Sequence, residues 1–101
     1  MTKATELIAA ERQRQITEEG WDAEHDRGHR DQLIRAGVVY AQSARVSLSA
    51  QAAVMHGWPW ERRFWKPTGD YVRDLVKAGA LIAAAIDCEL AERTSSDSGA
   101  S

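Results

Sequence analysis

The segment spanning about residues 69–92 repeats apolar side chains at every third or fourth position, and no other feature of the chain limits the fold as strongly. The positions that share one side of the expected helix are Val72, Leu75, Val76, Gly79, Ile82, Ala83, Ile86 and Leu90. A stripe with this period is typical of an α-helix whose apolar side faces a protein core. Thr68 or Asp70 is suited to cap it, because a short side-chain oxygen accepts hydrogen bonds from the free N–H groups at a helix start. We therefore predict a core helix here.

A first helix is expected over about residues 3–18. Thr2 or Thr5 can serve as its N-cap, for the same reason. Gly20 follows it, and glycine readily adopts the left-handed backbone conformation that commonly ends a helix. Local signals therefore predict both ends of this helix.

A second helix is expected over about residues 31–56, with Asp31 as its N-cap. Serines in its middle favour a break near Ser47, because their side chains compete for backbone hydrogen bonds. No strand pattern is evident, and residues 94–101 are small and polar, which is typical of a disordered tail. We predict one all-α domain of three main helices over residues 1–93.

Length and composition limit the cellular setting. The 101 residues suit one domain, and thirteen basic residues interleaved with fifteen acidic ones supply no positive block for duplex nucleic acid. Cys88 has no partner for an intramolecular disulfide, the N-terminus lacks a signal peptide, and the apolar run Ala78–Ile86 is too short to cross a membrane. We expect a cytoplasmic protein with neither duplex nucleic acid nor a membrane as partner.

The segment GWDAEHDRGHR, residues 20–30, lacks helical and strand periodicity, and we interpret it as an ordered loop held by Trp21. With the end of the first helix it gathers carboxylates, which are ligands that magnesium prefers. The candidate metal ligands are Glu11, Glu18, Asp22 and Asp26. Zinc bound through His25 and His29 with Asp22 or Asp26 is an alternative, since the two histidines would share one face of a helix. Gly28 between them disfavours a helix. A solvated acidic surface without a metal is the other interpretation.

The segment GWPWERRFWKPTG, residues 57–69, holds three of the four tryptophans, the only phenylalanine and both prolines. Prolines disfavour helix at the preceding residues, so we expect a loop. Indole and guanidinium groups together suit a ligand with bases and phosphates. The candidate ligand-binding residues of the two loops are Trp21, His25, His29, Trp60, Arg62, Arg63, Trp65 and Lys66. The alternative is that the tryptophans cover a core that is poor in large apolar residues.

Common catalytic motifs are not present in the sequence. It has no glycine-rich phosphate loop, no GxSxG motif and no paired CxxC motif, so no catalytic residue is assigned. Cys88 lies between Asp87 and Glu89, whose negative charges disfavour a thiolate nucleophile. We expect Cys88 to be a packing residue.

Three stretches, ERQRQITEEGWDAEHD, WPWERRFWKP and RDLVKAGALIAAAID, resemble small proteins encoded by tailed phages and prophages. The resemblance extends from Glu6 to about Glu92. It implies a bacterial host cell as the setting, and it implies no reaction.

The chain is also similar to MazG-like nucleotide pyrophosphohydrolases, which are all-helical and hold magnesium with acidic pairs on two helices. The acids that match on the first helix are Glu11, Glu18 and Glu19, and those on the last helix are Asp70, Asp74 and Asp87. The chain departs from the family pattern because its first helix has no ExxE pair and because Asp70 and Asp74 are four residues apart rather than three. The resemblance implies magnesium-dependent cleavage of a nucleoside triphosphate between its α and β phosphates.

A shorter stretch resembles ryanodine-receptor-type repeats, in which a helix leads to a GW dipeptide and a charged segment. The matching residues are Gly20, Trp21, Asp26 and His29. This similarity involves about a third of the chain.

Three functions are consistent with these patterns. The preferred hypothesis is a phage accessory protein that binds a small anionic ligand such as a nucleotide, with magnesium as a candidate cofactor. The alternatives are a MazG-like pyrophosphohydrolase and a module that binds a host or phage protein through its tryptophans and arginines. Homo-oligomer formation through the small-residue face of the last helix fits each of them.

Overall fold

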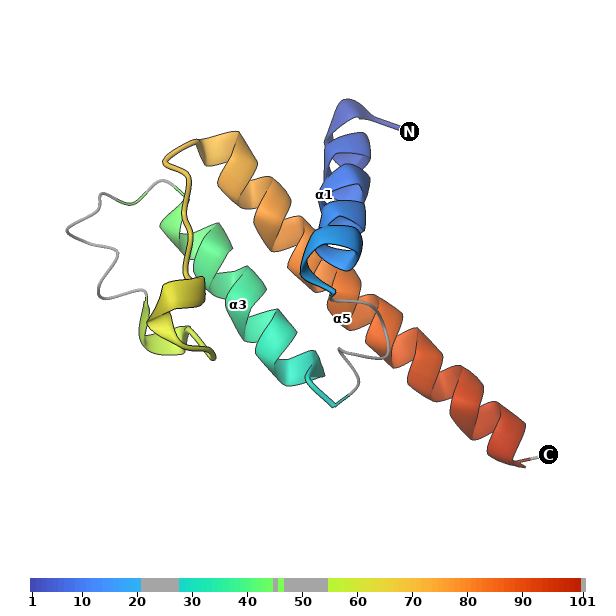
Figure 1. Ribbon diagram of the computed structural model, residues 1–101. Helices are drawn as coiled ribbons and strands as arrows, with labels where there is room; N and C mark the ends of the chain where they lie inside the picture. The colour runs from blue at the N-terminus through green and yellow to red at the C-terminus, as the bar shows by residue number, and fades with distance from the viewer. Residues whose placement is uncertain (21–27, 45, 47–54, 101) are drawn as a thin grey trace.

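The computed structural model describes residues 1–20, 28–44, 46 and 55–100. These residues form the α-helices α1 (Lys3–Glu19), α3 (Arg30–Ser43) and α5 (Tyr71–Ala100), the short 3-10 helices η1 (Met55–Gly57) and η2 (Arg62–Phe64), and no strand. Helix α5 packs against both α1 and α3 (Figure 1). None of the described helices is long and apolar enough to pass through a lipid bilayer. The prediction of an all-α fold with three main helices is confirmed.

The predicted ends of α1 are confirmed. The Thr2 hydroxyl accepts a hydrogen bond from the Thr5 backbone N–H at 3.3 Å. Gly20 has a φ of 72°, and its N–H donates to the carbonyl of Gln15. Both ends are set by residues within one turn of the helix, which explains why sequence alone located them.

The start of α5 is also as predicted, with Asp70 as its cap. The Asp70 carboxylate accepts a hydrogen bond from the Arg73 backbone N–H at 2.9 Å. Thr68, the other candidate, instead donates from its hydroxyl to the buried carboxylate of Asp74 at 2.8 Å and from its N–H to the same oxygen at 2.9 Å. The two residues therefore fix the turn that leads into α5.

The predicted bounds of the other helix ends need correction. Helix α3 begins at Arg30 after His29, not after Asp31, and it ends at Ser43, well before residue 56. The Ser43 hydroxyl donates to the Tyr40 carbonyl at 3.2 Å, the kind of local bond that competes with helix propagation. After Ser43, Ala44 forms a turn and Val46 a bend, and residues 55–56 belong to η1, whereas residues 45 and 47–54 lie outside the described part of the chain.

Helix α5 is longer than predicted. It continues through residue 100, so the predicted boundary near residue 92 is not where the helix ends. No proline after residue 92 stops the helix. Extending an existing helix by one residue costs less conformational entropy than starting a new helix, so α5 continues.

The core is formed by the sides of α5 that carry alanine. The buried residues of α5 and α3 that form one cluster are Leu33, Ala36, Tyr40, Ala78, Leu81, Ala84, Ala85 and Cys88. Glycines permit close helix contacts: a Cβ at Gly79 would lie 2.8 Å from the Ile8 side chain of α1, and one at Gly37 would lie 3.2 Å from the Ala78 carbonyl oxygen. The prediction that Cys88 is a packing residue is confirmed.

The predicted apolar stripe of α5 is real, but most of it does not face the core. The exposed fractions of its large side chains are 57% for Val72, 37% for Leu75, 41% for Ile82, 54% for Ile86 and 53% for Leu90. The helix is apolar on more than one side, and the alanine-rich sides allow α1 and α3 to approach more closely. The expectation that this stripe forms the core is therefore wrong for these five residues.

Candidate ligand pocket

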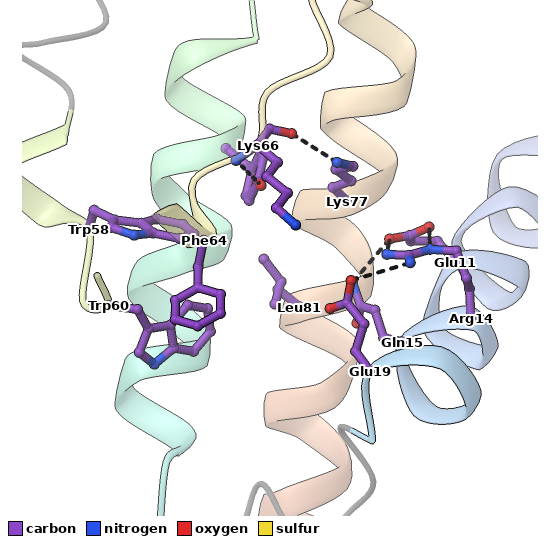
Figure 2. Close-up of a pocket in the computed structure, with 11 residues that line it drawn as sticks. Glu11, Arg14, Gln15, Glu19, Trp58, Trp60, Phe64, Lys66, Lys77 and Leu81 are labelled. Atoms are coloured by element: carbon purple, nitrogen blue, oxygen red, sulfur yellow. Dashed lines mark hydrogen bonds and ion pairs between the residues drawn. The ribbon is translucent and has the colours of Figure 1, made fainter. Parts of the chain in front are cut away.

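A pocket of about 290 Å³ lies between α1, α3, α5 and the aromatic segment, residues 57–69 (Figure 2). Its lining residues are Glu11, Arg14, Gln15, Glu19, Tyr40, Trp58, Trp60, Phe64, Lys66, Lys77 and Leu81. Charged side chains come from α1, α5 and Lys66, and aromatic rings come from α3 and the segment after η1. The pocket thus joins a polar wall to an aromatic wall.

Glu11 anchors the polar wall. Its side chain is buried, and its two carboxylate oxygens accept hydrogen bonds from Arg14 at 2.9 Å each. Arg73 of α5 also donates to this carboxylate. Burial raises the pKa of Glu11, but the hydrogen bonds and charges of Arg14 and Arg73 outweigh burial and hold the pKa below its ordinary value of 4.5. Glu11 is therefore ionised near neutral pH.

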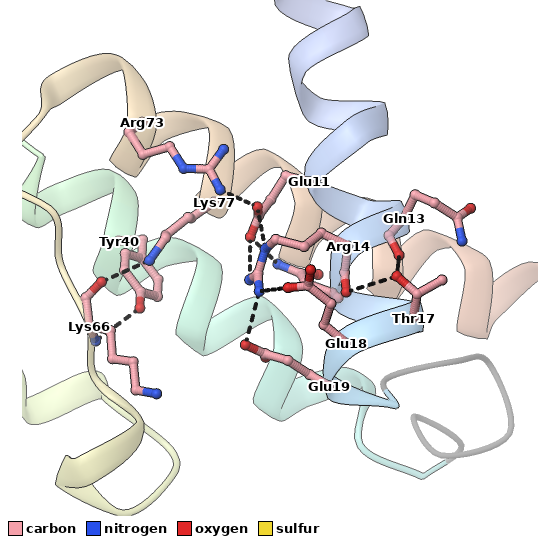
Figure 3. A network of polar contacts seen from close by, with 11 residues as sticks. Glu11, Gln13, Arg14, Thr17, Glu18, Glu19, Tyr40, Lys66, Arg73 and Lys77 are labelled. Carbon is pink, nitrogen blue, oxygen red and sulfur yellow. Dashed lines mark hydrogen bonds and ion pairs between the residues drawn. The ribbon is translucent and has the colours of Figure 1, made fainter.

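Arg14 is the centre of a cluster of carboxylates on α1 (Figure 3). Besides Glu11 it contacts Glu18 at 3.2 Å and Glu19 at 3.3 Å. The hydrogen bond to Glu11, opposed by burial and helped by the other two acids, raises the pKa of Arg14 above its ordinary value. Arg14 therefore pairs with three acids of α1 at once, and Glu11 is also paired with Arg73.

Lys77 supplies a half-buried cation on the α5 side of the pocket. Its ammonium donates to the Lys66 carbonyl at 2.9 Å and lies 5.6 Å from the centre of the Tyr40 ring. Burial lowers the pKa of Lys77 from its ordinary value of 10.5, although the charge of Glu11 acts in the opposite direction. The surroundings of Lys77 therefore compensate its positive charge only in part.

The aromatic wall is an ordered cluster. The centre of the Tyr40 ring lies 5.7 Å from that of Trp58 and 4.6 Å from that of Trp65, and the ring centres of Trp58 and Trp60 lie 5.3 Å apart. The indole N–H of Trp58 donates to the Glu61 carbonyl and that of Trp60 to the Gln32 side chain, both at 3.1 Å. Trp58, Trp60 and Trp65 all pack against the core, so the interpretation of the tryptophans as a core cover is supported, and two of them also line the pocket.

The structure brings together three of the predicted site residues and separates others from them. Glu11, Trp60 and Lys66 line the pocket. The predicted residues placed outside its lining are Glu18, His29, Arg62, Arg63 and Trp65. The four predicted residues that lie outside the described part of the chain are Trp21, Asp22, His25 and Asp26.

The residues outside the lining have other contacts. Trp65 packs on Tyr40, and Arg63 pairs with Glu61 at 3.2 Å and lies 4.8 Å from the centre of the Phe64 ring. His29 precedes α3, where its ring nitrogen is 3.1 Å from the Gln32 side-chain oxygen. Arg62 lies exposed in η2. These contacts account for most of the outlying residues as parts of the local structure.

The predicted metal ligands do not form a cluster in the described part of the chain. Among those residues, no group of three or more His, Cys, Asp or Glu side chains is arranged to hold a metal ion. Glu11 and Glu18 instead both contact Arg14. A magnesium site therefore stays a proposal.

Sequence reasoning did not single out Tyr40, Lys77, Arg73 and Leu81 as site residues. One signal was present, because Arg73, Lys77 and Leu81 follow each other at intervals of four and therefore share one side of a helix. That side of the helix lies away from the apolar stripe. Its contribution to the site can therefore be recognised only once the packing of α5 against α1 and α3 is known.

Neither protein-family models, curated proteins nor solved structures match this chain significantly. The resemblances to phage proteins and to MazG-like enzymes therefore stay predictions. The function is argued below from the pocket itself.

Proposed function

We propose that the pocket binds a small anionic ligand, and that this ligand is a nucleotide. The observation that carries the proposal is that one pocket combines lysine side chains with exposed aromatic surface. Stacking of a base on an aromatic side chain contributes about 1–3 kcal/mol to binding whichever base is present. A volume of about 290 Å³ is close to the smallest typical ligand sites.

Phosphate binding is assigned to Lys66 and Lys77. Burial disfavours the charged form of Lys77, and a phosphate beside it would restore the stabilisation that burial removes. Arg62 and Arg63, which the sequence suggested for this role, lie outside the pocket lining. The base is assigned to the opposite wall, where 43% of the Phe64 side chain is exposed.

A magnesium-dependent pyrophosphohydrolase is the second candidate. It is favoured by the three carboxylates of α1 that gather around Arg14 at the edge of the same pocket. Magnesium prefers carboxylate oxygens and commonly arrives with substrate phosphates. The ligands we propose for it are Glu11 and Glu18, with Asp22 and Asp26 outside the described residues.

The proposed setting is the cytoplasm of a bacterial cell that carries a phage. This proposal rests on the sequence resemblance alone.

Lys77→Met is expected to weaken ATP binding by about tenfold or more, because a charge-assisted hydrogen bond contributes about 1.5–3 kcal/mol. Binding is measured from tryptophan fluorescence during ATP titration, with and without magnesium. The affinity of the unchanged protein should fall as the pH rises through the lowered pKa of Lys77, because only the protonated ammonium attracts phosphate.

The matched control is Lys3→Met, which removes an equal charge from the exposed start of α1. Equal losses in both variants would show that binding depends only on net charge and would refute the pocket assignment. No saturable signal with ATP would instead favour the protein-binding module. Release of pyrophosphate in the presence of magnesium would support the second candidate.

Homo-oligomer formation is proposed through the exposed apolar side of α5. The alanine-rich sides are covered within the chain, so the free surface is the stripe of Val72, Leu75, Ile82, Ile86 and Leu90. Ile34 and Val38 of α3 are also exposed, each at 43%. Exposed apolar patches of this kind mark interaction sites, and a twofold axis can bury such a patch against itself.

Ile86→Glu is expected to convert the oligomer to monomer, because it places a charge in the middle of the apolar surface. The mass is measured by light scattering after size-exclusion chromatography. Thr94→Glu, an exposed polar position on the same helix, is the control and should leave the mass unchanged. A monomeric mass for the unchanged protein at high concentration would contradict this proposal.

A further inference from the structure

Gln15 holds a buried acceptor in the wall of the pocket. Its side chain is 2% exposed, and its amide oxygen has no hydrogen-bond partner among the described residues. Its amide nitrogen donates to the Glu11 carboxylate at 3.3 Å. Buried polar atoms nearly always have a partner, so one without a partner needs an explanation, and a bound group that donates to it is one.

The chemistry of Glu11 settles which amide atom is unpaired. Oxygen and nitrogen of a glutamine amide look alike, and the assignment follows from the partners. Glu11 is ionised, because its pKa is held below 4.5, and an ionised carboxylate only accepts hydrogen bonds. The atom of Gln15 that faces Glu11 must therefore be the NH2 group, and the unpaired atom must be the oxygen.

The wall around Gln15 offers acceptors. Glu19, one turn further along α1, lines the pocket beside it, and Glu11 lies one turn before it (Figure 2). Phosphate oxygens also only accept, so they cannot pair with the Gln15 oxygen. Arg14, the cation of this wall, is already paired with Glu11, Glu18 and Glu19, whereas Lys66 and Lys77 are placed to attract phosphate. A ligand group beside Gln15 must donate a hydrogen bond.

We propose that the Gln15 oxygen accepts a hydrogen bond from the exocyclic amino group of a nucleobase stacked on the aromatic wall. This inference rests on the proposed nucleotide function. Trp60 and Phe64 supply the stacking faces, and the carboxylate of Glu19 offers a second acceptor to the same base edge. The pocket therefore selects nucleotides whose base carries an amino group.

The Gln15 oxygen is shielded from solvent, so a neighbouring side chain must give way for the ligand to reach it. Glu19 is suited to this movement. Its side chain is 31% exposed and is held by an ion pair with Arg14 at 3.3 Å, and partly exposed pairs of this kind contribute little to stability. Moving the Glu19 side chain therefore weakens ligand binding only slightly.

The test compares ATP with purine riboside 5′-triphosphate, which differs from ATP only by the absence of the amino group. Both are titrated against the unchanged protein in the presence of a chelator, so that no divalent cation can bridge to Gln15. We expect ATP to bind about tenfold more tightly, the effect of one hydrogen bond to a buried acceptor.

Gln15→Met should remove this preference while retaining the shape of the side chain. Gln13→Met, at an exposed position of the same helix, should leave it intact. Equal binding of the two nucleotides to the unchanged protein overturns the inference but leaves the nucleotide site standing, whereas failure of both to bind overturns the proposed function as well. A preference that survives in a folded Gln15→Met protein also overturns it. If Gln15→Met does not fold, the nucleotide pair on the unchanged protein decides the matter.

Discussion

Glu11→Gln is expected to lower the free energy of unfolding by about 2–3 kcal/mol at pH 7, because it removes the charge that pairs with Arg14 and Arg73. Removing one member of a fully buried ion pair costs about 3–5 kcal/mol. The effect here is smaller because the side chains of Arg14 and Arg73 are 33% and 39% exposed and are partly solvated. Urea unfolding at pH 7 measures the difference.

The matched control for this variant is Glu18→Gln. Glu18 pairs with the same Arg14, at 3.2 Å, but its side chain is 65% exposed. Exposed ion pairs contribute about 0–1 kcal/mol, so the control should lose no more than that. Equal losses in the two variants would show that burial of Glu11 does not matter.

The effect of Glu11→Gln should depend on pH. The pKa of Glu11 in the folded protein lies below the ordinary value of 4.5, so its contribution to stability is complete above that value. The contribution is lost as the pH falls through the folded pKa, because the protonated carboxyl no longer pairs with the arginines. The stability difference between the two proteins should therefore shrink below pH 4.5. A constant difference down to that acid range would contradict the ionic explanation.

Three helix ends were predictable because the signals for them are local. Thr2, Gly20 and Asp70 each act within one turn, through a hydrogen bond or a backbone conformation that the residue type itself favours. At Ser43 the sequence predicted a longer helix than the structure has, because many serines continue a helix and the residue type alone does not show which of them ends it.

The burial of α5 was not predictable from periodicity alone. Periodicity shows that Ile82 and Ile86 share a side of the helix, but not which side is covered. The structure covers the sides that carry Ala80 and Ala84, since small side chains permit closer helix contacts. Side-chain size therefore decided which side of α5 packs against α1 and α3, and the large apolar side chains lie on the surface of the monomer.

The candidate site was predicted only in part for a similar reason. Trp60 and Lys66 come from one segment whose composition is unusual, and composition was enough to single them out. Tyr40 and Lys77 come from two different helices, and they meet only because α5 packs against α3. No pattern within either helix indicates that meeting.

Leu81→Ala is expected to lower the free energy of unfolding by about 3 kcal/mol, which lies within the range of about 2–5 kcal/mol for a buried leucine. Leu81 is 2% exposed, belongs to the core cluster and also lines the pocket. The truncation removes apolar contacts and leaves a cavity that the close-packed alanines around it fill poorly. Leu81→Met, which nearly conserves volume, should lose less than about 1.5 kcal/mol.

Leu90→Ala provides the comparison on the same helix, because 53% of that side chain is exposed. Measured at a concentration where the protein is monomeric, it should lose less than about 1 kcal/mol. If the Leu81→Ala protein remains folded, it should also bind ATP more weakly, because the pocket loses a side chain that lines it. Leu90→Ala should leave ATP binding unchanged. Equal losses of stability in the two variants would contradict the packing of α5 described here, since they would require its exposed and buried sides to be energetically alike.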